Sequence, residues 1–563
     1  MLDTPLFPFL RAILLAAAAI LAAPSFAQSD ASSRSDPGLD EATLYELLVG
    51  EIALQRGDAA LAAQTYAELA RSTRDPRIVR RAIEVANFAH QPELALEAAK
   101  LWSDMEPQSP QPLQVIAAIL IAGKRVDEAA PYLQKLLAAD GVNLENGYMQ
   151  LNRLLAGNPD KASNLRVVRE LAATHPELAQ AHFAVAQAAL VAGDEAVALA
   201  EIRQAQAIRP DWENAVILQA QVLQKRSPAE AAKVLGDFVE KHPASNEARL
   251  NYARALVLDK RFPEARKQFE AVLAANPGNT DVVYAVGLLA LQLKDYPVAE
   301  ENMKRLLSMN YRDPNGVRYL LGQIAEEQKQ WPRAIEWYGQ IDEGEHALGA
   351  RMRTASVMAK EGKVDEARAY LRRAAAENPD QEAQITVAEA QLLRDANRVR
   401  DAYEVLGQAL KKEPDQPDLL YDYALTAEKL QRYDVLENNL RKLMEVKPDH
   451  AHAYNALGYS LVERNTRLPE AKKLIQHALE LAPDDAFIVD SMGWLLYREG
   501  DLKGAADELR RAYNSRPDAE IGAHLGEVLW VMGQRDEARQ VWQESLKASP
   551  DNESLIKTIQ RFR

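Results

Sequence analysis

The same order of small, apolar and polar residues returns every 33 to 35 residues from about Ala42 onward. Alanines stand twelve and five residues before a proline, as in Ala198, Ala205 and Pro210. A spacing of seven residues is two helical turns, so both alanines lie on one helix face. A glycine such as Gly493, twelve residues before such an alanine, costs about 1 kcal/mol inside a helix, which points to close contact between two helix backbones. The pattern predicts a repeated helix–turn–helix unit.

Small and aromatic residues at this spacing resemble tetratricopeptide repeats, whose signature is a 34-residue helix–turn–helix. We count about fifteen units over residues 38–550. The clearest units are 449–483, 484–517 and 518–550. Two units are candidate joints, because glycines interrupt 142–176 and because 312–345 lacks its closing proline. Residues 551–563 are expected to form a helix that caps the end of the stack.

The first 37 residues lack the repeat. Residues 12–23 are a continuous apolar run, and the small residues that follow suit a signal peptide, 1–27, that is cut after Ala27. As a helix the run is about 18 Å long, shorter than the ~30 Å hydrocarbon core, so a retained membrane anchor is the alternative. Asp3, atypical in a leader, keeps that alternative open. Residues 28–37 are polar and aperiodic, which is typical of a flexible spacer.

The expected fold is therefore an all-α, right-handed superhelical solenoid of tetratricopeptide type. It divides into N-terminal units (38–141), the degenerate unit and possible hinge (142–176), a main array (177–550) and the capping helix. No segment is left for a catalytic domain, and GxGxxG, P-loop, HExxH and GxSxG motifs are absent. Such a stack offers an extended concave surface, which predicts a non-enzymatic, protein-binding role.

Composition narrows the class of partner. The hydrophobic fraction of 47% excludes a disordered chain. The chain has no cysteine, which excludes disulfides, thiolate metal sites and cysteine-linked lipids. A net charge of −15 argues against nucleic acid as the main partner. The nine histidines are scattered, so we expect neither a metal site nor a cofactor.

One local cluster runs against the acidic balance. Its five arginines lie within eleven residues, with only Asp75 between them: Arg71, Arg74, Arg77, Arg80 and Arg81. Such a basic patch can meet an anionic protein or lipid headgroups. A solvated helix face is the alternative.

Aromatic and polar residues on the first helix of each unit are the candidate binding residues. Helical steps from the packing glycine place ten of them in or near the groove: Tyr284, Tyr319, Tyr421, Asn455, Tyr459, Asp490, Trp494, Tyr497, Glu527 and Trp530. Tyrosine and tryptophan give large contact areas at low entropic cost. The alternative for each aromatic residue is packing between units.

Three segments resemble a more specific family. Residues 490–513, 524–542 and 44–70 are similar to a proteobacterial family of envelope tetratricopeptide proteins. The family includes an outer-membrane lipoprotein adaptor of a periplasmic carboxyl-terminal processing protease, which binds both the protease and its substrates, cell-wall hydrolases. The resemblance implies a periplasmic scaffold of this kind. The missing lipidated cysteine implies that this chain is not anchored by a lipid.

Two other functions are alternatives. The first is a scaffold in polysaccharide export or surface assembly. The second is an enzyme that acts on cell-wall material, for which Asp490 and Glu527 are the only carboxylate pair we nominate. Such chemistry needs two acids about 5 to 10 Å apart.

Overall fold

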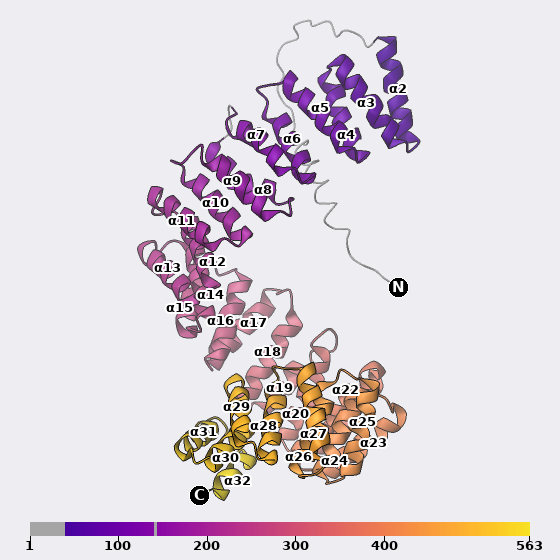
Figure 1. The fold of residues 1–563 in the computed structure, drawn as a ribbon, viewed down its shortest axis with the longest axis vertical. Coiled ribbons are helices and arrows are strands. Elements are labelled where there is room, and N and C mark those ends of the chain that lie inside the picture. The colour runs from indigo at the N-terminus through magenta and orange to yellow at the C-terminus, as the bar shows by residue number, and fades with distance from the viewer. Residues whose placement is uncertain (1–39, 140–142, 563) are drawn as a thin grey trace. The chain divides into compact units, whose positions relative to one another are not determined.

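The computed structural model describes residues 40–139 and 143–562, and the predicted signal peptide and spacer lie outside this part. Within it the chain forms 31 α-helices and one short 3-10 helix, with no strand (Figure 1). The helices follow one another as fifteen pairs and a final single helix, α32. The prediction of an all-α array of about fifteen helix–turn–helix units is confirmed.

The described residues divide into two compact units, and the boundary between them in the chain lies between Lys241 and His242. Unit 1 contains six helix pairs. They are α2 (Glu41–Gln55) and α3 (Ala59–Thr73), α4 (Pro76–Phe88) and α5 (Pro92–Met105), α6 (Pro110–Ala122) and α7 (Val126–Leu137), α8 (Leu144–Leu155) and α9 (Lys161–Ala172), α10 (Ala179–Ala192) and α11 (Glu195–Ile208), and α12 (Glu213–Gln224) and α13 (Pro228–Lys241).

Unit 2 contains nine helix pairs, a 3-10 turn at Pro379–Gln381 and α32 (Glu553–Arg561). The pairs are α14 (Asn246–Leu258) and α15 (Phe262–Ala275), α16 (Thr280–Gln292) and α17 (Tyr296–Ser308), α18 (Pro314–Glu327) and α19 (Trp331–Tyr338), α20 (Ala347–Lys360) and α21 (Val364–Glu377), α22 (Glu382–Asp395) and α23 (Val399–Lys412), α24 (Pro417–Lys429) and α25 (Tyr433–Val446), α26 (Ala451–Glu463) and α27 (Leu468–Leu481), α28 (Ala486–Glu499) and α29 (Leu502–Ser515), and α30 (Ala519–Val531) and α31 (Arg535–Ala548).

The pair α28–α29 shows why these residues make this unit. The Asp485 carboxylate caps α28 by accepting hydrogen bonds from the backbone N–H groups of residues 487 and 488. Gly500 ends the helix with a φ of 90°, a conformation that glycine adopts without steric cost. At Gly493 a β-carbon would lie 2.6 Å from Leu509 Cγ, so only glycine lets α29 come this close. The predicted close approach at Gly493 is confirmed.

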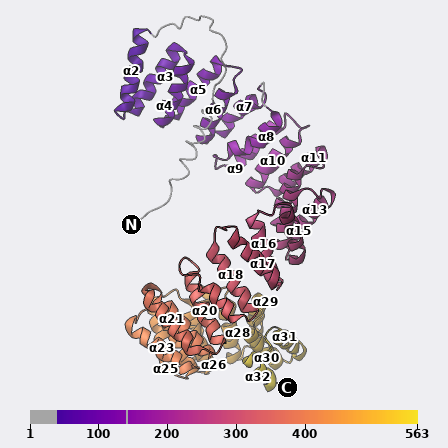
Figure 2. The same cartoon turned by 180° about the vertical axis from the view of Figure 1, so that it is seen from behind.

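Stacking brings equivalent helices of successive pairs together. In unit 2 the first helices α20, α22 and α24 contact one another in turn, as do α26, α28 and α30. The second helices α21, α23 and α25 lie one beneath another on one face (Figure 2). Within each unit, every second helix also contacts the first helix of the next pair, so packing continues from pair to pair along that unit.

The irregular units fold as helix pairs as well. Unit 142–176 forms α8 and α9, and its turn is held by Asn158, whose amide donates to Asn164 Oδ1 at 2.8 Å. In unit 312–345 the second helix α19 has only 8 residues. The boundary at 241/242 lies inside the predicted main array, and a hinge at 142–176 stays a prediction. No helix in the described part of the chain has the length and apolar character needed to cross a membrane.

Candidate protein-binding groove

A cleft of about 560 Å³ opens across three consecutive first helices of unit 2. Tyr319 of α18 and residues of α22 line its two walls, residues of α20 lie between them, and Leu371 of α21 completes the lining. The lining combines apolar and polar side chains, namely Tyr319, Gly349, Met352, Arg353, Ser356, Ala359, Lys360, Leu371, Ala388, Gln391, Leu392, Asp395 and Ala396. A mixed lining of this kind, on equivalent faces of stacked helices, suits a polypeptide segment better than a small apolar ligand.

A buried carboxylate supports the cationic side of the cleft. Glu326 on α18 is buried, and its Oε2 atom lies 3.3 Å from both Arg353 and Lys360 of α20. Tyr338 donates its hydroxyl hydrogen to Glu326 Oε1 at 2.9 Å. Burial, followed by the Glu326 charge, raises the pKa of Tyr338 above its usual value. Three donors thus compensate one buried charge, which fixes both cations at the mouth of the cleft.

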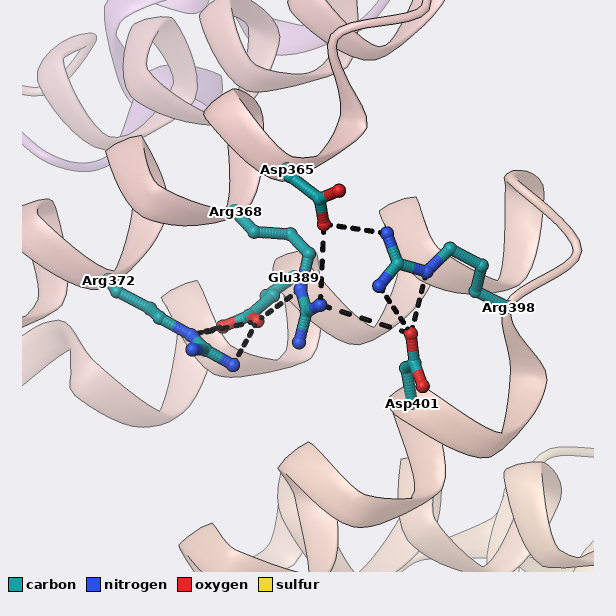
Figure 3. Close-up of polar contacts among 6 residues, drawn as sticks. All are labelled: Asp365, Arg368, Arg372, Glu389, Arg398 and Asp401. Atoms are coloured by element: carbon teal, nitrogen blue, oxygen red, sulfur yellow. Dashed lines mark hydrogen bonds and ion pairs between the residues drawn. The ribbon is translucent and has the colours of Figure 1, made fainter.

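A second buried carboxylate fixes the opposite wall (Figure 3). Glu389 of α22 is buried and accepts hydrogen bonds from Arg368 Nε and Arg372 Nε of α21, both at 3.1 Å. Asp365 and Asp401 bind Arg398, at 2.7 and 2.5 Å, and both lie within ion-pair reach of Arg368. The network joins α21, α22 and α23. Because Ala388 and Leu392 lie on the same helix as Glu389, the network also holds their wall in place.

Three predicted tyrosines share one environment. Tyr284, Tyr319 and Tyr421 are half-buried. Each packs on the aromatic ring of a residue that lies just before the first helix of the next pair. The ring pairs and centroid separations are Tyr284–Tyr311 at 5.5 Å, Tyr319–His346 at 5.6 Å and Tyr421–His450 at 5.3 Å. Burial raises the pKa of both Tyr284 and Tyr421. Of these three, only Tyr319 lines the cleft.

The predicted residues near the C-terminal end form a polar and aromatic cluster inside the stack. His524 on α30 stacks on Trp494 with ring centroids 4.2 Å apart, and its Nδ1 lies 2.9 Å from Asp490 Oδ2. Tyr459 OH lies 3.5 Å from His524 Nε2. Trp494 donates its indole N–H to Glu463 at 2.5 Å. Asp490 and Trp494 are buried, so the structure places these two predicted groove residues inside the stack.

The last predicted residues lie at the C-terminal end of the stack, which α32 covers. Tyr497 donates to the buried Glu527 at 3.2 Å, and Arg561 of α32 forms an ion pair with the same carboxylate. The Trp530 ring stacks on Trp542 at 5.7 Å and is half-buried. Asn455, also half-buried, has a buried Oδ1 atom that accepts no hydrogen bond from the described residues. The predicted candidates are thus spread along the stack rather than gathered at one point.

The arginine cluster is more nearly neutral than its sequence suggests. Arg71 pairs with Glu97 at 2.6 Å, and Arg77 pairs with Asp75 at 2.8 Å. Arg81 pairs with Glu51 at 3.0 Å and with Glu84 at 3.1 Å. Arg80 lies over the Trp102 ring at 5.5 Å, and Arg74 caps the end of α3. The expectation that only Asp75 opposes these arginines is wrong, because α2 and α5 bring Glu51 and Glu97 to them and α4 itself supplies Glu84.

One exposed cluster has metal-ligating atoms. Asp313, Glu345 and His346 place one ligand atom each within 4.8 Å of one another. Asp313 already caps α18 by accepting the Gly316 backbone hydrogen at 2.8 Å. Because exposed acidic groups gather in this way without an ion, we assign no metal to them.

The comparisons with known proteins agree with this architecture. The sequence matches the tetratricopeptide repeat family over residues 222–280, 284–347, 387–435 and 350–380. It is 34% identical over 493 residues to the TPR repeat-containing protein PA4667 of Pseudomonas aeruginosa, covering 86% of this chain and 82% of that protein. The chain belongs to the tetratricopeptide-repeat protein family.

More distant likenesses extend over most of the chain. It is 24% identical over 533 residues to cellulose synthase operon protein C of Xanthomonas axonopodis pv. citri, covering 85% of this chain but only 33% of that protein. Among solved structures, yeast Tom70 is 15% identical with a TM-score of 0.35, covering 93% of this chain and 95% of that chain. Cut9 in its complex with Hcn1 is 15% identical with a TM-score of 0.33, covering 92% and 96%.

Sequence reasoning missed most of the polar contacts between successive first helices of these tetratricopeptide repeats. Five of them are Glu326–Lys360, Arg394–Asp422, Glu463–Trp494, Asp490–His524 and Glu527–Arg561. Their members are 28 to 34 residues apart in the chain. A search for complementary polar residues one repeat apart would have found them, since such positions face each other across the stack.

Proposed function

We propose that this protein is a non-enzymatic scaffold of the cell envelope that binds other proteins through the first helices of unit 2. The observation that carries the proposal is the cleft across α18, α20 and α22. Its walls are fixed by the buried carboxylates of Glu326 and Glu389, so the surface is organised before a ligand arrives. Preorganisation of this kind reduces the entropic cost of binding.

The nature of the lining narrows the ligand to an extended polypeptide. Arg353 and Lys360 offer positive charge, Gln391 and Asp395 offer polar contacts, and Met352 and Leu392 offer apolar contacts. This mixture suits a segment with alternating acidic and apolar side chains. The carboxylates nominated for catalysis, Asp490 and Glu527, are both buried and engaged in ion pairs, which favours the scaffold over an enzyme.

In its finer form, the proposal is that the scaffold brings substrates to a periplasmic carboxyl-terminal processing protease. The support is the resemblance of residues 490–513, 524–542 and 44–70 to the envelope adaptors of that protease. A periplasmic location, with residues 1–27 removed as a signal peptide, is part of the same proposal.

A binding and degradation assay with purified components tests this function. We expect the chain from Gln28 onward to bind the host's processing protease and to speed degradation of a cell-wall hydrolase. Ser356→Arg, which fills the cleft, should reduce binding of that hydrolase, the client of the scaffold, at least tenfold. Glu404→Arg on the exposed face of α23 is the matched control and should leave it unchanged. Equal client binding by both variants would exclude the cleft as the binding surface.

The second candidate is a scaffold for polysaccharide export or surface assembly. The observation that favours it is the 24% identity to a cellulose synthase operon protein. Crosslinking in the host's periplasm separates the two. Glycan-assembly proteins as the leading crosslinked species, with the protease absent, would replace the adaptor proposal with this one.

A further inference from the structure

The first helix of the array leaves an apolar face uncovered among the described residues. On α2 the exposed fractions are 49% for Leu44, 69% for Tyr45, 53% for Leu48 and 46% for Ile52. Large apolar side chains gathered on one helix face mark an interaction surface, whereas single ones are ordinary. Terminal repeats of a stack normally present a polar outer face, because no neighbour covers them. The α2 face departs from this rule.

The position of α2 in the array explains why this face is exposed. In unit 1, α4 and α6 each contact the second helix of the preceding pair, α3 and α5 respectively. As the first described helix, α2 has α3 as its main contact and no preceding helix in the described part. No helix in the described part therefore covers the face of α2 that carries these apolar side chains.

The spacing of the apolar residues is symmetric about one position. Leu44, Leu48 and Ile52 follow each other at four-residue intervals and form a single ridge along α2. In an antiparallel pair of α2 helices with its two-fold axis at Leu48, Leu44 of each copy lies opposite Ile52 of the other. An isologous interface requires this kind of self-complementarity.

The charges at the two ends of α2 are complementary in the same arrangement. Glu41 lies in the first turn, and Arg56 is the C-cap residue. They lie seven and eight residues from Leu48, so the antiparallel pair brings Glu41 of one copy beside Arg56 of the other. The antiparallel helix dipoles are compatible with this pairing.

We propose that α2 is a self-association surface, through which two copies of this protein pair in antiparallel register about Leu48. One helix from each copy makes an interface at the small end of the specific range, below about 1,200 Å². The dimer is therefore in equilibrium with monomer, with dissociation at micromolar concentration. This proposal does not depend on the groove, because the groove lies in unit 2.

Sedimentation velocity on the chain from Gln28 onward tests the association. We expect the average mass to rise with concentration between about 1 and 100 μM. Leu48→Glu should raise the dissociation constant at least tenfold. Val191→Glu is the matched control, since Val191 on α10 is 63% exposed but lies outside the ridge. If the protein is a monomer at every concentration, the proposal is overturned. The occupant of the α2 face would then be another protein or residues 1–39.

Cysteine and charge-reversal variants test the register without disturbing the core. The chain contains no cysteine, so a single cysteine can crosslink only between copies. Leu48→Cys should oxidise to a dimer, whereas Leu44→Cys should do so only when mixed with Ile52→Cys. Crosslinking of Leu48→Cys no faster than Val191→Cys would overturn the proposal. Glu41→Arg should weaken association, and the double variant with Arg56→Glu should restore it.

Discussion

The two ends of the array share one internal contact and differ in what covers them. At each end a glycine on the first helix lies against an aromatic ring of the second helix, Gly50 against Tyr66 and Gly526 against Trp542. At the C-terminal end α32 packs on α30 and α31, and Phe562 lies 6.0 Å from the Trp542 ring. At the N-terminal end α2 exposes its apolar ridge in the part of the chain that the structure describes. The two ends therefore share the contact within a helix pair, whereas only the C-terminal end has a further helix packed on it among the described residues.

The largest expected effect comes from removing the aromatic ring at the covered end. Trp542 is buried, so Trp542→Ala should destabilise the C-terminal repeats by about 3–5 kcal/mol. Hydrogen exchange of the full chain is the measurement, because repeats unfold locally. Protection should fall in α30, α31 and α32 and stay unchanged in α2 and α3. Uniform loss of protection would mean that the two ends are not independent.

The same type of substitution, leucine to alanine, made at both ends compares directly how well each end is covered. Leu555 on α32 is fully buried, so Leu555→Ala should cost about 2–4 kcal/mol, up to the local stability of that helix. Leu48→Ala should change the stability of the monomer by no more than about 0.5 kcal/mol, since the side chain is half exposed. Exchange in α32 and in α2 at submicromolar concentration measures both. Equal costs would show that residues outside the described part cover α2.

The repeat itself could be predicted from sequence, and its long-range contacts could not. The spacing of Ala505 and Ala512 alone predicts a buried helix face, and both residues are buried. The sequence does not decide whether Trp494 lies in the groove or packs between units, because its exposure depends on His524, which lies one repeat away. Charge compensation at Arg81 likewise depends on Glu51, thirty residues earlier. Local periodicity fixes which helix face a residue occupies, but only the stacking decides what lies opposite it.

A change of pH should affect the stability of the two ends differently. Burial alone would lower the pKa of His524, but the Asp490 carboxylate, with Glu463 and Glu520, raises that pKa above its usual value. The stability from this pair is therefore present below about pH 6.5 and is lost as pH rises through the folded pKa. Neither α2 nor α3 contains a histidine, so the N-terminal end lacks this dependence.

Urea unfolding at pH 6 and pH 9 measures that effect. The loss of stability should amount to about 1.4 kcal/mol for each unit by which the pKa is raised. His524→Gln should remove the difference between the two pH values that comes from this pair. His90→Gln is the control, because His90 lies exposed in the turn after α4. An unchanged pH dependence in His524→Gln would show that the Asp490–His524 pair is not charged in the folded protein.

The smallest expected effect tests whether the arginines near the uncovered end matter for stability. Arg71 and Glu97 form a bidentate pair on the surface, with both side chains about half exposed. Exposed pairs of this kind contribute about 0.2–1 kcal/mol and are screened by salt. Arg71→Ala should therefore lower protection in α3 and α5 slightly at low salt and not at 1 M salt. A salt-independent loss of several kcal/mol would instead show that the Arg71 side chain acts by packing, and that the N-terminal end is held together by more than its helix pairs.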